Sequence, residues 1–373
     1  MNGTWQGKYT GTNSGQIVVE LDDMGDHFRG CAYAYDDNSG LPSTFAVIKT
    51  PDKKSRTKFN APLAPLDPRT GEPTEWKNIA VLFQGQNVVV PNTADVECEW
   101  DQKSLKLSWL TDIGTSGSAS INKSQADQPS TYKPMPISNW EDFKKHVLTL
   151  EQYRFIYRGQ TNTWRLRSPF HRTGRGDMRN FFFQDIPVLH RSLSARTKHV
   201  FNLADPLQNA AFLNMVQHHG YPTPLLDWTY SPFVAAYFAY HRVRKADAEK
   251  TNNDQKVRIF LFDAKEWRNS FQQILNVVVR WQHFSLVEPI SIENDRLIPQ
   301  QALSSFTTVD DIESYIAAKE IDVDKQFLQV IDLPLGERDL VIRELTLMGV
   351  TAGSLFPGLE GTCEELRERF FSF

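Results

Sequence analysis

Two different sequence patterns divide this chain near residue 122, and this division constrains the fold more than any other feature. Before it, short apolar runs are separated by turn signals such as Asn13-Ser14-Gly15 and Asp37-Asn38-Ser39-Gly40. After residue 138, capping residues followed by Pro open longer apolar segments, a pattern typical of helices. We therefore expect an α+β chain built from two domains of different construction.

The segment 1–122 predicts an antiparallel β domain, either a barrel or a sandwich. Its expected strands are Gln16–Leu21, His27–Tyr35, Phe45–Ile48, Ile79–Phe83, Val88–Val90 and Leu105–Trp109. Small and aromatic residues share one register in the first hairpin, which carries Trp5, Gly7, Tyr9 and Gly11. This pattern fits a tightly packed barrel end, or a surface on which a small molecule or a protein acts as a trigger.

Residues 112–136 have the Ser, Gly, Thr and Pro content of a linker, and we place the linker itself at 123–137. The domain at 138–373 is expected to be mixed α/β. Its predicted helices are Ser138 to about Leu150, Asp205 to Gly220, Ser231 to Tyr240 and Leu335–Met348, with a final helix after Gly358. Its predicted strands are Tyr153–Arg158 and Lys256–Asp263.

Composition excludes several classes of protein. The chain has 373 residues and a formal net charge of −4, which is not suited to coating nucleic acid as a whole. It contains no apolar run long enough to cross a membrane and shows no secretory signal pattern. Its three cysteines form no CxxC or CxxH spacing, so we expect neither a disulfide framework nor structural zinc. These features predict a cytoplasmic protein.

Basic residues are concentrated between residues 152 and 198. This segment carries ten of them, and only Asp177 and Asp185 oppose them. They are Arg154, Arg158, Arg165, Arg167, Arg172, Arg175, Arg179, Arg191, Arg196 and Lys198. A basic region on an acidic protein predicts a site for phosphate or another anion.

Within this region Arg158 is the preferred anion-binding residue. It stands at the end of a predicted strand, next to Gly159, which permits close approach of a ligand or of backbone. Its guanidinium presents a planar set of donors suited to phosphate or carboxylate. The alternative is a structural pair with an Asp or Glu.

A second polar segment, Gln217 to Ser231, lies around a predicted helix end. His218 and His219 are adjacent, so on a helix they point about 100° apart and cannot chelate one metal ion together. Asp227 stands in an apolar run, and a buried acid there requires a partner. Arg158 or a backbone nest would provide one, in either a structural or a catalytic role.

The motifs in this order resemble the FRG domain family, over roughly Ser138 to Phe373. The resemblance rests on Tyr157-Arg158-Gly159-Gln160, Gln217-His218-His219-Gly220, Leu225-Leu226-Asp227-Trp228-Thr229, Ser231-Pro232, Arg296 with Gln300, and Phe356-Pro357-Gly358-Leu359-Glu360-Gly361. The chain departs from the family pattern at Tyr157, Pro224, Ala302 and Gly358. The β domain lies outside this resemblance.

The same layout is similar, more weakly, to the ADP-ribosyltransferase superfamily. That resemblance implies that NAD is a substrate, that Arg158, Asp227 and Gln300 are catalytic, and that no metal takes part. The residues implied to bind NAD are Arg158, Gly159, Gln160, His218, His219, Trp228, Thr229, Ser231 and Arg296. Gln300 lacks the negative charge of the Glu usual at the late position, which Glu293, Asp295 or Glu360 would supply instead.

The resemblances imply one function, and the basic segment motivates an alternative. The first is transfer of ADP-ribose from NAD to a protein or nucleic acid, or hydrolysis of NAD, in a toxin or an anti-phage defence effector. The second is a module that binds a nucleotide or nucleic acid without chemistry. In either case the β domain would respond to a trigger.

Overall fold

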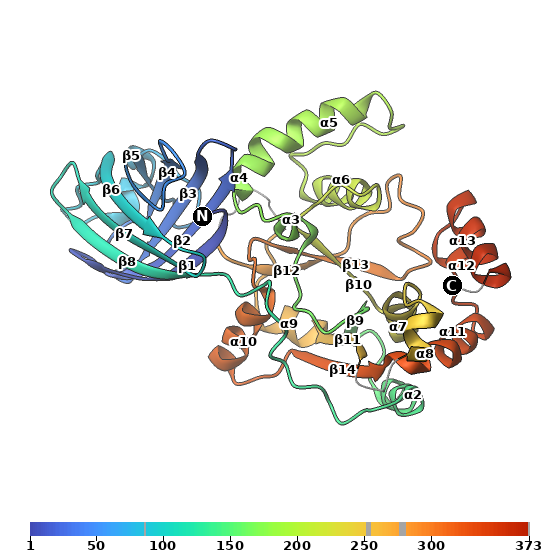
Figure 1. Ribbon diagram of the computed structural model, residues 1–373. Coiled ribbons are helices and arrows are strands. Elements are labelled where there is room, and N and C mark those ends of the chain that lie inside the picture. Colours follow the sequence, from blue (N-terminus) through green and yellow to red (C-terminus); the bar gives the residue numbers. More distant parts are fainter. Residues whose placement is uncertain (86, 251–254, 276–280, 372–373) are drawn as a thin grey trace. The chain divides into compact units, whose positions relative to one another are not determined.

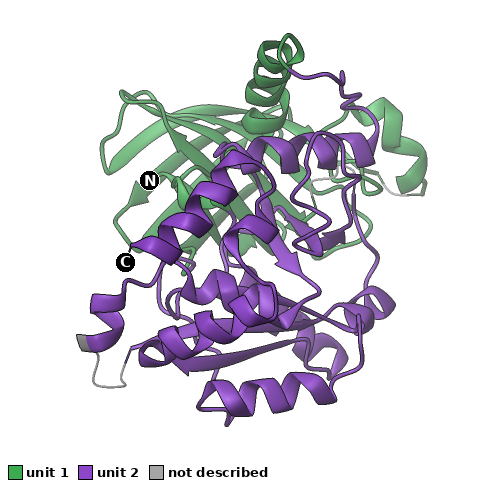
Figure 2. Cartoon of the chain, turned by 90° about the vertical axis from the view of Figure 1, so that its right-hand side faces the viewer, with its two compact units in different colours: residues 1–125, 169–196, 276–282 green, residues 126–168, 197–275, 283–373 purple. Residues whose placement is uncertain are grey.

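The computed structural model describes residues 1–85, 87–250, 255–275 and 281–371 (Figure 1). The chain divides into two compact units that alternate along the sequence (Figure 2). Unit 1 contains residues 1–125, 169–196 and 276–282, and unit 2 contains residues 126–168, 197–275 and 283–373. Residues 169–196, which lie inside the predicted second domain, are therefore part of unit 1.

Unit 1 is built on a closed barrel in which each strand pairs antiparallel with the next and β8 pairs with β1. The strands are β1 Gly3–Gly11, β2 Gly15–Asp23, β3 Phe28–Asp36, β4 Thr44–Lys49, β5 Arg56–Pro65, β6 Thr93–Trp100, β7 Ser104–Thr111 and β8 Ser116–Lys123. The predicted antiparallel β domain is confirmed, and of the two alternatives the barrel is formed.

Two of the predicted strands are not strands. Ile79–Phe83 lies across α1 (Trp76–Ile79) and the 3-10 helix η1 (Ala80–Phe83), and Val88–Val90 lies outside the regular elements. Ile79 and Phe83 are buried while Val81 and Leu82 between them are exposed, which is the spacing of a helix. An apolar run this short does not distinguish a strand from a helical turn.

The Ser- and Gly-rich segment after residue 112 is another correction, since Ser116–Lys123 forms β8 and closes the barrel. Its small residues have a packing reason. A Cβ atom on Gly117 would lie 2.4 Å from Cζ2 of Trp109, because the Trp109 ring of β7 covers this glycine. Gly117, part of the linker-like composition, is therefore explained by packing against an aromatic ring on the adjacent strand.

Residues 169–196 of unit 1 are largely helical. They comprise α3 Pro169–Arg172, α4 Met178–Asn180, the π-helical turn η2 Phe181–Asp185 and α5 Ile186–Ser194. Asp22 of β2 accepts hydrogen bonds from the backbone N–H of Gly176 at 2.8 Å and of Asp177 at 3.1 Å. Arg175 adds an ion pair to the same carboxylate at 2.7 Å. These contacts connect the helical segment to the barrel.

Unit 2 contains a six-stranded sheet in the order β12-β13-β10-β9-β11-β14, and neighbouring strands are antiparallel (Figure 1). The strands are β9 Phe155–Gln160, β10 Leu225–Thr229, β11 Lys256–Asp263, β12 Phe284–Val287, β13 Ala302–Thr307 and β14 Leu328–Pro334. An N-terminal barrel followed by this mixed region confirms the predicted α+β class.

The helices of unit 2 include several that begin at a side-chain N-cap. The helices of this unit are α2 Trp140–Thr149, α6 Pro206–His218, α7 Pro232–Tyr240, α8 Lys245–Lys250, α9 Ala264–Ser270, α10 Ile312–Val323, η3 Leu335–Glu337, α11 Arg338–Leu347, α12 Ala352–Leu355 and α13 Leu359–Phe370. Asp205 caps α6 and Ser231 caps α7, as predicted. The cap of α2 is Asn139, one residue after the predicted Ser138. Among the described residues, no helix is both long and apolar enough to cross a membrane.

Both faces of this sheet are covered by apolar clusters. On one face, α2, α7 and α11 pack against alternate residues of β9, β11 and β14. On the other, Trp267 of α9 and residues of α10 pack against Trp228, Phe260 and Phe262 of the sheet. Because β11 lies between two covered faces, its residues Val257 to Asp263 are all buried.

The closest approach in this packing is that of α7 to Gly159. A Cβ atom on Gly159 would lie 1.9 Å from the carbonyl oxygen of Ala235 and 2.7 Å from the nitrogen of Ala239. Gly159 was predicted to permit close approach of a ligand or of backbone. In the structure the backbone of α7 makes this approach.

We predict that Gly159→Ala destabilises the protein, because either α7 or β9 must move. Overpacking of this kind costs about 1–3 kcal/mol. The free energy of unfolding, measured by denaturant titration, checks this. Thr161→Ala, an exposed position nearby, is the control and should stay within about 0.5 kcal/mol of the parent. Equal stability of the two variants would contradict the packing role.

Candidate functional site

The motifs selected from the sequence come from three neighbouring strands of unit 2. Arg158 lies on β9, Asp227 and Thr229 lie on β10, and Gln300 lies two residues before β13. In the sheet order β13, β10 and β9 are adjacent. Residues far apart in the sequence are therefore brought to one region of the sheet.

Arg158 connects β9 to β10. These two strands are paired at one position, where Thr229 lies opposite Tyr157. Beyond that pair, Nη1 of Arg158 donates a hydrogen bond to the backbone carbonyl of Asp227 at 2.6 Å. The half-buried guanidinium thus places a positive charge between two central strands. This contact is to the main chain of Asp227, whereas the partner expected for the Asp227 carboxylate was Arg158 or a backbone nest.

The Asp227 carboxylate is held from α6. Nε2 of Gln217 donates to Oδ1 of Asp227 at 2.7 Å, and the Thr223 hydroxyl donates to Oε1 of Gln217. Both amide atoms of Gln217 are therefore used, which fixes the orientation of the amide. Asp227 itself is half-buried. Asp227 therefore has a carboxylate oriented by Gln217 and a main-chain carbonyl bound by Arg158.

The turn after β10 is tied to the residues before β13. The hydroxyl of Thr229 donates to the carbonyl of Gln300 at 2.7 Å and accepts from the N–H of Ser231 at 3.0 Å. The Ser231 hydroxyl caps α7 by accepting from Val234 N at 3.3 Å. Thr229 is buried and Ser231 half-buried. The Thr229–Ser231 turn therefore has a fixed shape, set by its own hydroxyl groups.

Gln300 is buried, and its side chain is directed toward α12. Nε2 of Gln300 donates to the carbonyl of Leu355 at 3.0 Å. Gln160, at the end of β9, donates to the carbonyl of Trp164 at 2.9 Å. In this structure both side-chain amides bind main-chain carbonyls.

His218 belongs to a buried polar network. Its Nδ1 lies 2.8 Å from Oδ1 of Asn294, the amide of Asn294 donates to Asn214, and Nδ2 of Asn214 donates to the Ser304 hydroxyl at 3.1 Å. Asn214 and Ser304 were not among the predicted site residues. Asn214 could have been found from the sequence, because it is a polar residue within the apolar run of α6 and a buried amide needs hydrogen-bond partners.

The other predicted residues lie in different surroundings. Trp228 is in the core, and its Nε1 donates to the Ser305 hydroxyl at 3.0 Å. His219 is exposed at the C-terminal end of α6. Arg296 pairs with Glu360 at 2.6 Å and lies 5.3 Å from the Phe356 ring centre.

The acids considered for the late position are all exposed. Glu360 is engaged by Arg296, and Oε1 of Glu293 accepts from His199 N at 2.5 Å. Asp295 lies between them in the sequence. Asp227 differs from these acids because its main-chain carbonyl accepts a hydrogen bond from Arg158. Among the described residues, no group of three or more His, Cys, Asp and Glu side chains is arranged to hold a metal ion.

The basic segment 152–198 is not a single positively charged site. Five of its arginines bind carboxylates, and its residues are divided between the two units. The pairs are Arg154 with Asp263, Arg165 with Asp311, Arg167 with Asp310, Arg175 with Asp22 and Asp185, and Arg179 with Glu72. The sequence-local excess of charge is offset by acids distant in the sequence. Structural ion pairs therefore account for much of this arginine content.

Arg165 and Asp311 form the most deeply buried of these pairs, with side chains 8% and 5% exposed. We predict that Arg165→Ala destabilises the protein by about 3–5 kcal/mol, because it leaves a buried carboxylate without its counter-charge. Lys198→Ala, in the same basic segment but exposed, should change stability by less than about 0.5 kcal/mol. Denaturant unfolding measures both, and similar effects would show that the pair is unimportant.

Burial lowers the pKa of the His218 imidazole below its ordinary value, whereas the Asp227 carboxylate acts to raise it. Since the folded-state pKa is depressed, neutral His218 favours the folded state above the unfolded pKa of about 6.5, and this contribution is lost as the pH falls below that value. We predict that Asp227→Asn lowers the pKa of His218 further. NMR titration of the histidine ring measures this, and an unchanged or higher pKa would contradict the proximity of the two groups.

Comparison with known proteins identifies one family and one similar structure. Residues 153–248, which contain Arg158, α6, β10 and α7, match the FRG domain. Among solved structures, a redesigned β barrel, mFAP1, bound to DFHBI, is similar at 12% sequence identity and a TM-score of 0.23, over 33% of this chain and 94% of that chain. The comparison with curated proteins gives no match. The chain thus contains an FRG domain at residues 153–248.

Proposed function

We propose that unit 2 cleaves the bond between nicotinamide and ribose in NAD and transfers ADP-ribose to a macromolecule or to water. One observation carries the proposal. Arg158, the Thr229–Ser231 turn and Gln300 come from the neighbouring strands β9, β10 and β13, and hydrogen bonds link them through Asp227 and Thr229. The order of these residues along the chain is the one that the resemblance to ADP-ribosyltransferases implies.

The residues present fit a dinucleotide in charge and in hydrogen-bonding capacity. The half-buried guanidinium of Arg158 would bind the diphosphate, since Arg favours phosphate oxygens. The fixed Thr229–Ser231 turn would frame the nicotinamide end. Gln300, whose carbonyl orients Thr229, would act by holding that turn in place.

The chemistry requires stabilisation of positive charge. When the C1′–N bond breaks, nicotinamide leaves with the electron pair, and an acceptor oxygen or nitrogen bonds to C1′ and loses a proton. The transition state carries positive charge on the ribose, which an oriented carboxylate stabilises. We assign that role to Asp227, because Gln217 fixes its carboxylate and Arg158 binds its main chain.

The alternative of a non-catalytic nucleic-acid module has less support. It was motivated by the basic segment, and five of its arginines are in ion pairs with carboxylates. Charges that are already neutralised contribute little to phosphate binding and to counterion release. A single nucleotide at Arg158 requires less positive charge than a nucleic-acid surface does.

We predict that Asp227→Asn lowers the rate of nicotinamide release from NAD by about 100-fold or more, the size expected for loss of one preorganised electrostatic group. The amide keeps an oxygen that accepts from Gln217, so the fold should persist. Release is measured by chromatography, with and without cell extract as the source of acceptor. Asp322→Asn, an exposed acid on α10, is the matched control and should keep the parent rate.

A parent protein that neither releases nicotinamide nor transfers label from NAD would overturn the proposal. In that case salt-dependent binding of NAD or of an oligonucleotide without turnover would favour the binding module. Consumption of NAD or modification of a macromolecule also fits a toxin or an anti-phage effector. Growth arrest on expression, relieved by Asp227→Asn and not by Asp322→Asn, would support that role.

A further inference from the structure

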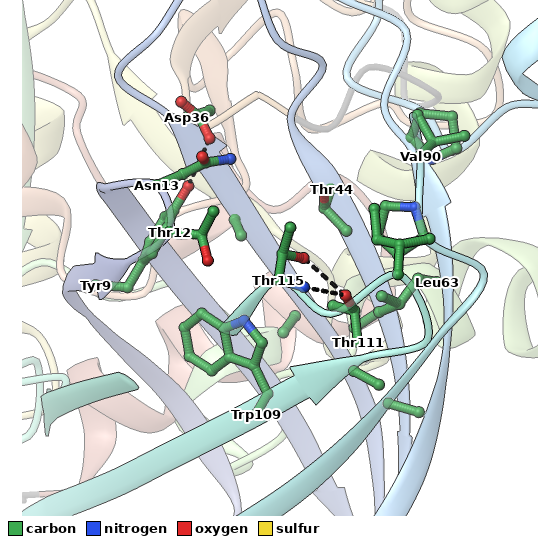
Figure 3. Close-up of a pocket in the computed structure, with 18 of the residues that line it drawn as sticks. Tyr9, Thr12, Asn13, Asp36, Thr44, Leu63, Val90, Trp109, Thr111 and Thr115 are labelled. Atoms are coloured by element: carbon green, nitrogen blue, oxygen red, sulfur yellow. Dashed lines mark hydrogen bonds between the residues drawn. The ribbon is translucent and has the colours of Figure 1, made fainter. Parts of the chain in front are cut away.

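The barrel of unit 1 encloses a cavity of about 180 Å³ at one end (Figure 3). It lies at the end of the strands where the β1–β2 turn is located, among Tyr9, Ile17, Phe59, Leu107 and Trp109. In Figure 3, Tyr9 and Asp36 lie on one side of the cavity and Leu63 and Val90 on the other. Val88 to Val90, the run predicted as a strand, contributes to the lining together with Pro91.

The cavity exists because the inward residues at this end are small. Eight strands give a barrel interior that side chains can just fill. Six alanines line this end: Ala32, Ala34, Ala46, Ala61, Ala64 and Ala94. At the other end of the strands, large residues such as Trp5, Phe28 and Leu105 fill the core. The sequence thus places methyl groups where packing alone would favour larger side chains.

The lining is mainly apolar, with polar groups at defined places. The Tyr9 hydroxyl donates to Oδ2 of Asp36 at 3.2 Å, and the hydroxyl groups of Thr111 and Thr115 lie 2.7 Å apart. Burial and the neighbouring Asp36 carboxylate raise the pKa of Tyr9, so its hydroxyl remains protonated at neutral pH. Asp36 is the one formally charged residue among the described residues that line the cavity.

We propose that this cavity binds a small, uncharged, largely apolar molecule of one or two rings that carries a hydrogen-bond donor directed at Asp36. A dry apolar cavity of about 150 Å³ accommodates benzene, which sets the scale. A carboxylate or phosphate would be desolvated beside Asp36 without a cation from the lining, so anions are disfavoured. The ligand class therefore differs from NAD, and this inference does not depend on the proposed function.

The test uses the full chain and 1-naphthylamine, a neutral two-ring probe with an N–H donor whose emission shifts to shorter wavelength in apolar surroundings. We expect saturable binding at one site. Ala46→Phe, which places a ring in the cavity, should weaken binding about tenfold or more, a loss of about 1.4 kcal/mol. Val47→Phe adds the same ring to the outside of β4, where Val47 is 40% exposed, and should leave the affinity within twofold of the parent.

Competition distinguishes the ligand class. 1-Naphthylmethanol should displace the probe, and 1-naphthoate, which has the same rings but is an anion, should displace it at least tenfold more weakly. Thermal unfolding verifies that the variants are folded, and Ala34→Leu provides a smaller filling change if Ala46→Phe does not fold. Absence of saturable binding, equal binding by the filled and control variants, or equal displacement by the two competitors would overturn the proposal.

Discussion

The Arg158 contact with the Asp227 carbonyl is the interaction on which the candidate site depends. β9 and β10 share one residue pair in their register, so a side chain, rather than a continued ladder, connects them beyond it. The same arginine supplies the positive charge proposed to bind NAD. In the proposed function, one guanidinium both connects two strands and binds the substrate, so its replacement would affect the fold and the activity together.

The surroundings of this contact limit how the strands can move. α7 packs on Gly159 at a distance that excludes a Cβ atom, and Ser231 caps the same helix. Thr229 binds both the residue before α7 and the segment before β13. The turn that frames the proposed pocket is thus built into the packing of the sheet, as preorganisation of a catalytic site requires.

The two units use polar groups differently. In unit 2, Gln217 of α6 orients the Asp227 carboxylate. His218 and Asn214 of the same helix belong to a second chain of hydrogen bonds. In the barrel, polar groups are few and lie at the edge of an apolar cavity. The first arrangement suits chemistry on a charged substrate and the second suits retention of an uncharged one. The proposals for the two units can therefore be tested separately.

Local signals in the sequence predicted the features whose cause is local. Asp205-Pro206 and Ser231-Pro232 marked the starts of α6 and α7, because a cap requires only the following few residues. The pairing of the arginines could not be predicted, since Arg165 and Asp311 are brought together by the fold. β8 was not predicted as a strand because its Ser and Gly content resembles that of a linker. Gly117 is small because the Trp109 ring of the neighbouring strand covers it.

The sequence by itself determined the α+β class, the antiparallel β domain and the motifs that match an FRG domain. The tertiary structure decided which motifs meet, because strand order in a sheet is not encoded in any one segment. It also decided that α7 packs on Gly159, that five arginines of the basic segment pair with carboxylates, and that alanines leave a cavity in the barrel. Each of these depends on contacts between residues distant in the chain, for which local composition carries no signal.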